Sequence, residues 1–364
     1  MLARYLSSVG LAVALLVAMT LGTAPLAGQA QGGLSKPVVS GKIPRTPDGK
    51  PDFQGTWDVS TVTPLERPAD FGGRLVLSED EVRKLQGNEA ARVERGAKPS
   101  DPDRGAPKVD GNVGGYNNFW IARGDRILRI NGQARSSVIV DPPDGKVPEQ
   151  TAEAKKRNAV ARGSVALPQS DAPENIQVRG AGAFDDIELR PLAERCIMAF
   201  GSSSGPPTLP NYFYNNLKQI VQTPQSIMIL IEMIHDARIV GMNAQHAPSN
   251  IRSWMGDSVG RWEGDTLVIE TTNFTPKTRY RGSSENLKVT ERLTRTDEKT
   301  ILYQFTVEDP STWARPWSGE YTWLKTDDQI YEYACHEHNY AMGDILRGER
   351  ILDKEKQQEE APKK

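Results

Sequence analysis

The second half of the chain constrains the fold most, because short apolar segments alternate there with tight polar turns. Their side chains repeat with a period of two, so each segment would place one set of residues on one face of a strand. No helical crossover separates these segments, which favours antiparallel pairing in a meander. The expected strands cover residues 211–223, 226–236, 260–274 (two strands), 286–296, 300–307, 318–326 and 329–338.

A meander of this length has two unpaired edges unless it closes on itself. We therefore expect a mainly β fold, an antiparallel meander that closes into a lipocalin-like β-barrel with a few peripheral helices and long loops. An opening strand is expected within residues 51–62, and a capping box at Ser78 and Glu81 predicts a helix over residues 82–94. Further helices are expected over 151–162 and, after Asn339, over 340–356.

The first thirty residues have the pattern of a secretory signal. Arg4 precedes an apolar run from Leu11 to Leu21, and small residues follow it. A membrane anchor is the alternative, but the run is shorter than the roughly 20 residues of a spanning helix. The expected organisation is a signal peptide (1–30), a flexible linker (31–50), a single β-barrel domain (51–352) and a disordered tail (353–364). The mature protein would be periplasmic or secreted, without a membrane span.

The chain has two cysteines, Cys196 and Cys335. In an oxidising compartment such a pair indicates a disulfide. Closing so long a loop would stabilise the fold by roughly 4–5 kcal/mol in the chain-entropy model. Two free buried thiols, or a nucleophile or metal ligand, are the alternatives.

Charge and motifs exclude several classes of protein. The formal net charge is -2, whereas a nucleic-acid binder usually has a basic excess, so no nucleic-acid partner is expected. The chain has neither a phosphate-cradling loop with Lys-Ser/Thr nor a Rossmann fingerprint, which argues against nucleotide cofactors. We expect no cofactor and a small-molecule ligand or substrate as the partner.

Two resemblances add to this interpretation. Gly55-Thr56-Trp57 resembles the Gly-x-Trp start of lipocalin-like barrels. Most of the mature chain is similar to a large family of secreted bacterial hypothetical proteins, from which no activity can be transferred. In that family the position of His338 is often glycine, which argues against an essential role for His338. The similar runs lie at residues 51–58, 136–148, 194–196, 222–240, 251–274, 281–287, 307–317 and 331–348.

Histidines beside carboxylates are the candidate catalytic groups. His336 and Glu332 would share one face of the strand expected over 329–338, and burial in a barrel would make this pair an acid and a base. His235 and Asp236 follow a hydrophobic strand, and a carboxylate that orients a histidine is a common acid–base unit. The alternative for each histidine is a structural hydrogen bond to a main-chain carbonyl.

His336 and His338 also form a His-x-His pair, the centre of a cupin metal motif. The glutamate that a cupin needs a few residues later is missing, so no metal site is predicted. His246 lies in a loop and is a candidate ligand-binding residue.

Tryptophan and arginine lie close together in the segments 252–257, 260–265 and 313–317. Arg252, Trp254 and Trp313 are therefore candidate ligand-binding residues, since both residue types stack on ring-shaped ligands. The alternative is that tryptophan fills the core and arginine covers it.

These observations favour an extracytoplasmic small-molecule enzyme that uses cofactor-independent His/carboxylate acid–base chemistry, of lyase, isomerase or hydrolase type. The alternative function is a non-catalytic, lipocalin-like binding protein for an apolar or aromatic ligand. A structural envelope protein is a third hypothesis. An enzyme should gather titratable groups at one place, whereas a carrier should enclose a mainly apolar cavity.

Overall fold

The structure is a computed structural model, and the residues that it describes belong to one compact unit. They are residues 33–99, 103, 105, 121, 123–162, 184, 186–190, 192–199, 205–210, 214–234, 236–278, 280–337 and 339–360. The expected signal peptide lies outside them. Within the described part of the chain, no helix has an apolar stretch long enough to cross a membrane.

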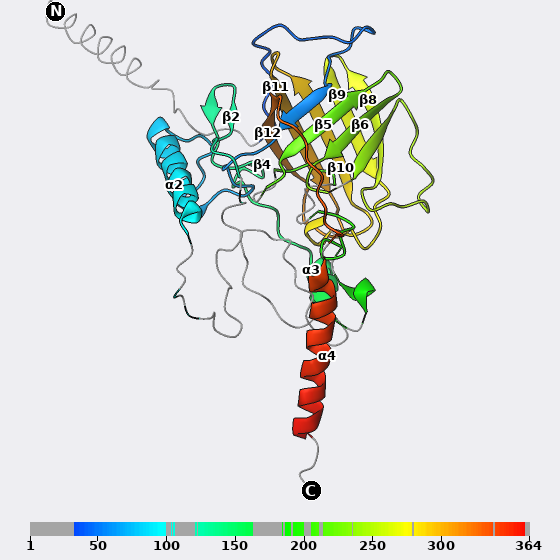
Figure 1. Ribbon diagram of the computed structural model, residues 1–364. Coiled ribbons are helices and arrows are strands. Elements are labelled where there is room, and N and C mark those ends of the chain that lie inside the picture. Colours follow the sequence, from blue (N-terminus) through cyan, green and yellow to red (C-terminus); the bar gives the residue numbers. More distant parts are fainter. Residues whose placement is uncertain are drawn as a thin grey trace, which may run out of the picture. The chain divides into compact units, whose positions relative to one another are not determined.

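Nine strands form a closed barrel, as the alternating pattern predicts (Figure 1). The ring closes because the first strand pairs with two partners, β5 on one side and β12 on the other. The mainly β, barrel-forming architecture is therefore confirmed. The strands are β1 (Gly55–Asp58), β5 (Leu217–Gln222), β6 (Ser226–Ile231), β7 (Ala237–Met242), β8 (Asp257–Glu263), β9 (Thr266–Thr272), β10 (Lys288–Arg295), β11 (Thr300–Glu308) and β12 (Trp317–Thr326).

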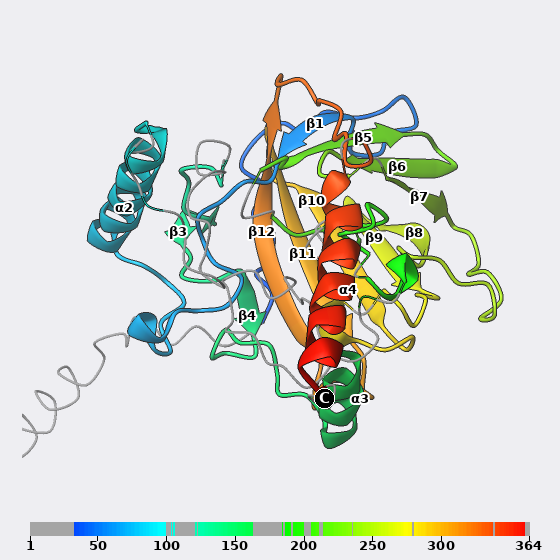
Figure 2. The ribbon, with the colours of Figure 1, turned by 60° about the horizontal axis from the view of Figure 1, so that its bottom comes forward.

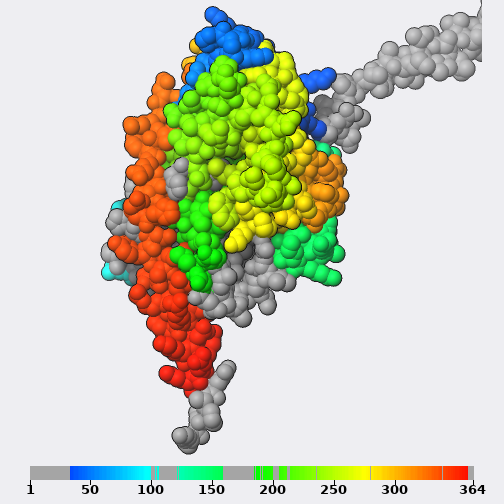
Figure 3. All heavy atoms as spheres, turned by 90° about the vertical axis from the view of Figure 1, so that its right-hand side faces the viewer, coloured from blue at the N-terminus to red at the C-terminus, as the bar shows by residue number. Residues whose placement is uncertain are grey.

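One pair of neighbours in the barrel, β7 and β8, is parallel, and all the other barrel pairs are antiparallel. An odd number of strands cannot alternate in direction all the way round a closed ring, so nine strands require at least one parallel pair. The connection over residues 243–256 must accordingly return along the barrel before β8 begins. Figure 3 shows the molecule from the right-hand side of Figure 1, and the strands on this part of the barrel wall are coloured green to yellow.

In the part of the chain that the structure describes, three more strands and three α-helices lie outside the ring (Figure 2). A short strand, β4 (Ile139–Asp141), pairs with β12 outside the ring, and β2 (Arg129–Ile130) and β3 (Gln133–Ala134) form a hairpin. The helices are α2 (Glu79–Ala97), α3 (Ala152–Arg162) and α4 (Tyr340–Glu360), with single 3-10 turns at Ala69–Phe71, Ile187–Leu189 and Tyr280–Gly282. The predicted capping box at Ser78 and Glu81 is present at the start of α2.

Aromatic side chains fill much of the barrel interior. Tyr303 stacks on Trp323 with ring centroids 5.0 Å apart, and it meets Tyr321 edge to face at 5.1 Å. Gly319 lies opposite Phe305 in the register, and a β-carbon at Gly319 would come within 2.5 Å of the Phe305 ring. The glycine therefore makes room for the ring. The largest fully buried side chains of the barrel strands include Trp57, Trp317, Trp323, Tyr303, Tyr321 and Phe305.

The segment 205–210 packs against this interior and is buried along its whole length. The main-chain N–H of Thr208 donates to the hydroxyl of Tyr303 at 2.8 Å, and the hydroxyl of Tyr321 donates to the carbonyl of Thr208. Since both tyrosines face inward, the segment is held by the barrel core.

The structure corrects several local expectations. Residues 329–338 were expected to form a strand, but residues 327–335 have no regular secondary structure. The chain from 353 to 360 continues helix α4 instead of forming a disordered tail. The expected linker is held against the barrel, because Ser35 donates two hydrogen bonds to the carboxylate of Glu320, at 2.8 and 2.6 Å. Long-range contacts of this kind have no local sequence signal.

Candidate active site

Lys218 is the most unusual titratable group of the barrel. Along β5 the buried residues alternate with partly exposed ones, and Lys218 occupies a buried position together with Ile220. Its partners in the register are Trp57 on β1 and Ile231 on β6. The Lys218 side chain is fully buried, and its Nζ has no hydrogen-bond partner among the described residues. An amine in this position is enclosed by the packed core of the barrel.

Burial changes the acid–base behaviour of this amine. Removal from water penalises the ammonium form and lowers the pKa of Lys218 from its usual 10.5 to about 7. The negative charges of Glu232 and Asp58 oppose this effect but do not cancel it. A large share of the Lys218 side chains is therefore neutral near pH 7, when an ordinary lysine is almost wholly protonated.

Glu232 lies just beyond the end of β6 and is also buried, with 7% of its surface exposed. Its carboxylate accepts hydrogen bonds from the main-chain N–H groups of Leu217, at 3.1 Å, and Tyr331, at 3.4 Å. These bonds tie it to the start of β5 on one side and to the irregular segment after β12 on the other. Glu232 therefore supplies a fixed negative charge at the end of the barrel that holds Lys218.

A buried ion pair and a tyrosine hydroxyl link β7, β10 and β11. Arg238 forms a bidentate ion pair with Glu291, in which Nη2 lies 2.8 Å from Oε1. Burial alone would lower the pKa of Arg238, but the attraction of Glu291 outweighs it and keeps that pKa raised. The hydroxyl of Tyr303 donates to Glu291 at 2.7 Å, and burial raises the pKa of Tyr303 well above its ordinary value. Both terminal nitrogens of Arg238 are thus engaged by Glu291, whereas its Nε has no hydrogen-bond partner among the described residues.

Lys218 and Glu232 together can move a proton. A neutral amine accepts a proton from a carbon or a hydroxyl, and the ammonium that forms is stabilised by the nearby carboxylate. Such a base works best when its pKa lies near the working pH, which the burial of Lys218 achieves. In the Arg238–Glu291 pair the two charges neutralise each other, so we assign no proton transfer to it.

The titration of Lys218 predicts a specific dependence of stability on pH. In the unfolded chain the amine stays protonated up to its usual pKa, whereas in the folded protein it loses its proton near pH 7. Between about pH 7 and 10.5 the unfolded state therefore binds one more proton. Relative to the variant Lys218→Met, the free energy of unfolding of the wild type should rise by up to about 1.4 kcal/mol per pH unit in this window.

Urea unfolding of both proteins at a series of pH values measures this difference. Lys325→Met serves as the control, because Lys325 is exposed on β12. Relative to this variant, the free energy of unfolding of the wild type should not rise with pH. A difference between the wild type and Lys218→Met that stays constant from pH 7 to 10 would contradict the depressed pKa.

The sequence-predicted pair His336 and Glu332 does not lie in the barrel. Both side chains are exposed, because the segment that carries them is not a strand of the sheet. His235 and His338 lie outside the described residues. Asp236 is half-buried in the turn between β6 and β7, and its carbonyl accepts a hydrogen bond from the N–H of Ile231. The expected burial of His336 and Glu332 was therefore wrong, and their catalytic role stays a prediction.

His246 is held between two carboxylates on the outer side of the barrel. Its Nδ1 lies 2.7 Å from the carboxylate of Asp257, and its Nε2 lies 3.5 Å from that of Glu270. Lys288 pairs with the other oxygen of Glu270 at 2.7 Å. A carboxylate that orients a histidine was predicted for His235 and appears here at His246. Since Glu270 already faces Nε2, the ring has no nitrogen directed at open space.

Arg252 and Trp313 make contacts within the fold, and the ligand-binding role of Arg252, Trp254 and Trp313 stays a prediction. Arg252 donates from Nη1 to the carbonyls of Phe274 and Glu285, both at 3.0 Å, and thereby links two loops. Trp313 is buried and meets Trp317 edge to face, with ring centroids 5.9 Å apart. Trp254 is half-buried, and its carbonyl accepts a hydrogen bond from Thr278. The alternative interpretation, in which tryptophan fills the core, therefore holds for Trp313.

The predicted disulfide between Cys196 and Cys335 is present, with the α-carbons 5.7 Å apart. It ties the irregular segment after β12 to the buried chain around residue 196. Asn339 adds to this link by donating to the carbonyl of Glu194 at 3.0 Å. The segment that covers Glu232 is thus anchored only a few residues from Tyr331.

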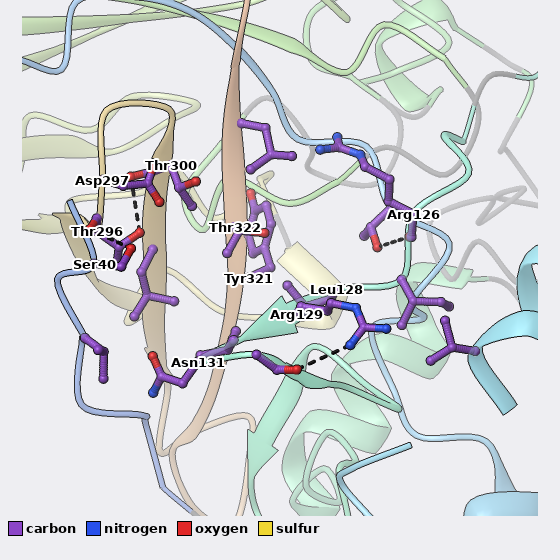
Figure 4. Close-up of a pocket in the computed structure, with 18 of the residues that line it drawn as sticks. Ser40, Arg126, Leu128, Arg129, Asn131, Thr296, Asp297, Thr300, Tyr321 and Thr322 are labelled. Atoms are coloured by element: carbon purple, nitrogen blue, oxygen red, sulfur yellow. Dashed lines mark hydrogen bonds between the residues drawn. The ribbon is translucent and has the colours of Figure 1, made fainter. Parts of the chain in front are cut away.

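A groove of about 720 Å³ lies on the outer side of the barrel, between β12, the β10–β11 turn and the chain around β2 (Figure 4). Leu128, Leu302 and Leu324 contribute apolar surface to it. Arg126 and Arg129 also line it, but each is paired with a carboxylate, Asp58 and Glu79 respectively, at 2.6 Å. The groove has the size of a small-molecule pocket and has no free cation among these arginines.

Sequence analysis missed Lys218 as a site residue, and Arg238 and Glu291 as a buried ion pair. A signal for two of them was present. Lys218 has Ile220 at i+2, and Glu291 has Val289 and Leu293 at i−2 and i+2, so the alternation itself places both charges on the inward face. Among the described residues, no group of three or more His, Cys, Asp or Glu side chains is arranged to hold a metal ion.

Comparison of the chain with protein-family models, with curated proteins and with solved structures found no match.

Proposed function

We propose that the protein is an extracytoplasmic small-molecule enzyme that uses cofactor-independent acid–base chemistry, of lyase, isomerase or hydrolase type. Lys218 is the proton-transfer group, and Glu232 stabilises the ammonium that it forms. The observation that carries the proposal is the Lys218 amine, which is fully buried in the barrel without a hydrogen-bond partner among the described residues.

A structural role explains this lysine poorly. An unpaired buried polar group costs about 1–3 kcal/mol, and methionine would fill the same space without that cost. The buried charge of Arg238, by contrast, is balanced by a bidentate pair with Glu291, although its Nε has no hydrogen-bond partner among the described residues. Strongly perturbed titratable groups concentrate at functional sites, where the cost in stability serves the chemistry.

The compartment rests on two features. The first thirty residues have the pattern of a secretory signal, and the Cys196–Cys335 disulfide suits an oxidising environment. We place the mature protein in the periplasm or outside the cell. A substrate would reach Lys218 past Glu232, where the cover is the irregular segment around Tyr331 and not a strand of the barrel.

A substrate screen tests the proposal. The purified wild type and the variants Lys218→Met and Lys325→Met are incubated with neutral and anionic small molecules, and turnover is followed by NMR. We expect at least one compound to be converted by the wild type and Lys325→Met, with a rate that depends on a group titrating near pH 7. Conversion should fall at least a hundredfold in Lys218→Met, since general bases contribute about 10²–10⁴ in rate. Conversion unaffected by Lys218→Met would refute the assignment.

The alternative, a lipocalin-like binding protein for an apolar or aromatic ligand, is favoured by one observation. The barrel interior is occupied by aromatic side chains, but the outer groove is lined partly by leucine side chains and is large enough for a ligand. Saturable binding of an apolar compound without turnover, equal in the wild type and Lys218→Met, would support binding over catalysis.

A further inference from the structure

We propose that Lys218 is a nucleophile that forms an imine with a neutral aldehyde or ketone. This inference rests on the proposed function and names its substrate class. It is carried by the inward position of Lys218 on β5, its burial beside Trp57 and Ile231, and the buried carboxylate of Glu232 at the same end of the barrel.

Imine formation needs an amine that is neutral, dry and close to a proton carrier. Lys218 Nζ makes no hydrogen bond within the described part of the chain, so its lone pair is not engaged there by another group. Burial lowers the pKa of Lys218 to about 7, so about half of the amines are neutral at pH 7, against about one in three thousand for a lysine with its usual pKa of 10.5. The buried site also limits water, which would reverse the reaction.

The chemistry balances without an oxidant or a reductant. The Nζ lone pair adds to the carbonyl carbon, the C=O π electrons move to oxygen, and a proton passes from nitrogen to that oxygen to give a carbinolamine. A second proton, taken up from solvent, protonates the oxygen, so that water leaves while the nitrogen lone pair forms the C=N bond. Glu232 is the only buried carboxylate named above at this end of the barrel, and it is the group that we assign to carry these protons. The cationic imine that results is stabilised by its negative charge.

The charges around Lys218 select a neutral substrate. Glu232 acts on Lys218 as a negative charge and would repel a carboxylate or a phosphate on the substrate. Asp58 also acts on Lys218, but Arg126 pairs with it at 2.6 Å. Two buried arginines lie on the barrel strands described here. Arg238 is neutralised by its bidentate pair with Glu291, and Arg295 on β10 places its guanidinium 5.1 Å from the centre of the Trp57 ring while it donates to the main-chain carbonyls of Asp52 and Glu298. The side chains in register with Lys218, Trp57 and Ile231, are apolar and fully buried. The charge of Glu232 and these apolar neighbours favour a neutral carbonyl compound with a small apolar body over an anionic one.

Reductive trapping tests the inference. The intact oxidised protein is treated at pH 7 with sodium cyanoborohydride and a limiting amount of propanal or of pyruvate, and peptide mapping by mass spectrometry locates the N-alkylated lysines. We expect propanal to modify Lys218 at least tenfold faster than any surface lysine, and pyruvate to modify it at least tenfold more slowly than propanal does. Lys325→Met should keep the Lys218 adduct, and Lys218→Met should lose it.

Near-ultraviolet circular dichroism confirms that Lys218→Met is folded. As a second variant, Glu232→Gln keeps the amine but removes the carboxylate, so the adduct should still map to Lys218 and form more slowly. Propanal adducts confined to surface lysines in the wild type would overturn the imine inference. If turnover found in the substrate screen nevertheless depends on Lys218, the acid–base proposal survives that result; if no turnover depends on Lys218, both proposals fail.

Discussion

Replacement of Arg238 by methionine is expected to lower the free energy of unfolding by about 3–5 kcal/mol. The substitution removes one partner of a buried ion pair and leaves the carboxylate of Glu291 without its counter-charge in the barrel interior. Of the hydrogen bonds to Glu291 described above, only the one from the hydroxyl of Tyr303 would remain. Urea unfolding at pH 7, followed by tryptophan fluorescence, measures the loss.

Two further variants separate the ion pair from simple packing. The double substitution Arg238→Met with Glu291→Leu should recover most of the stability, because it removes both charges and keeps apolar volume. Arg261→Met breaks an exposed pair with Glu263 on the barrel wall and should cost less than about 1 kcal/mol. If Arg238→Met proved no more destabilising than Arg261→Met, the pair would not be buried as described.

Removal of the disulfide by Cys196→Ser with Cys335→Ser is expected to destabilise the protein by about 4–5 kcal/mol in the chain-entropy model. The large value follows from the sequence separation of 139 between the two cysteines, since a longer closed loop restricts the unfolded chain more. Guanidinium unfolding of the oxidised wild type and of the double variant measures the difference.

The disulfide also has a local effect that can be measured separately. Cys335 lies close along the chain to Tyr331, whose N–H donates to Glu232, so the double variant should exchange the Tyr331 amide hydrogen faster. A reducing agent should reproduce both effects in the wild type and change nothing in the double variant. Equal unfolding midpoints for all of these samples would show that the tether does not stabilise the fold.

Sequence analysis predicted correctly those features that depend on neighbouring residues, and the one disulfide for which only a single pairing exists. Helix α2 starts where Ser78 and Glu81 satisfy each other's main-chain donors, which four consecutive residues can specify. The strands β10 and β11 follow the alternation of apolar residues, and a tight turn joins them. The pairing of Cys196 with Cys335 is the only disulfide that two cysteines in one chain can form.

The candidate site could not be predicted in the same way. Residues 329–338 alternate like a strand, but β12 already pairs with β11 and β1, and the ring has no free edge at its closing strand. The segment therefore lies outside the sheet, and His336 and Glu332 are exposed. Lys218, which looks like a solvated charge in the sequence, lies inside because β5 and β1 are in register at Trp57.

The sequence by itself determined the class of fold, since the alternation of apolar residues and the number of expected strands require a barrel to satisfy their edges. It also determined the starts of the helices and the disulfide. The tertiary structure decided the closure of the ring through β1, the parallel pair β7–β8 and the identity of the buried charges. The physical reason is range: turns, caps and alternation act over a few residues, whereas the desolvation of Lys218 depends on strands from distant parts of the chain.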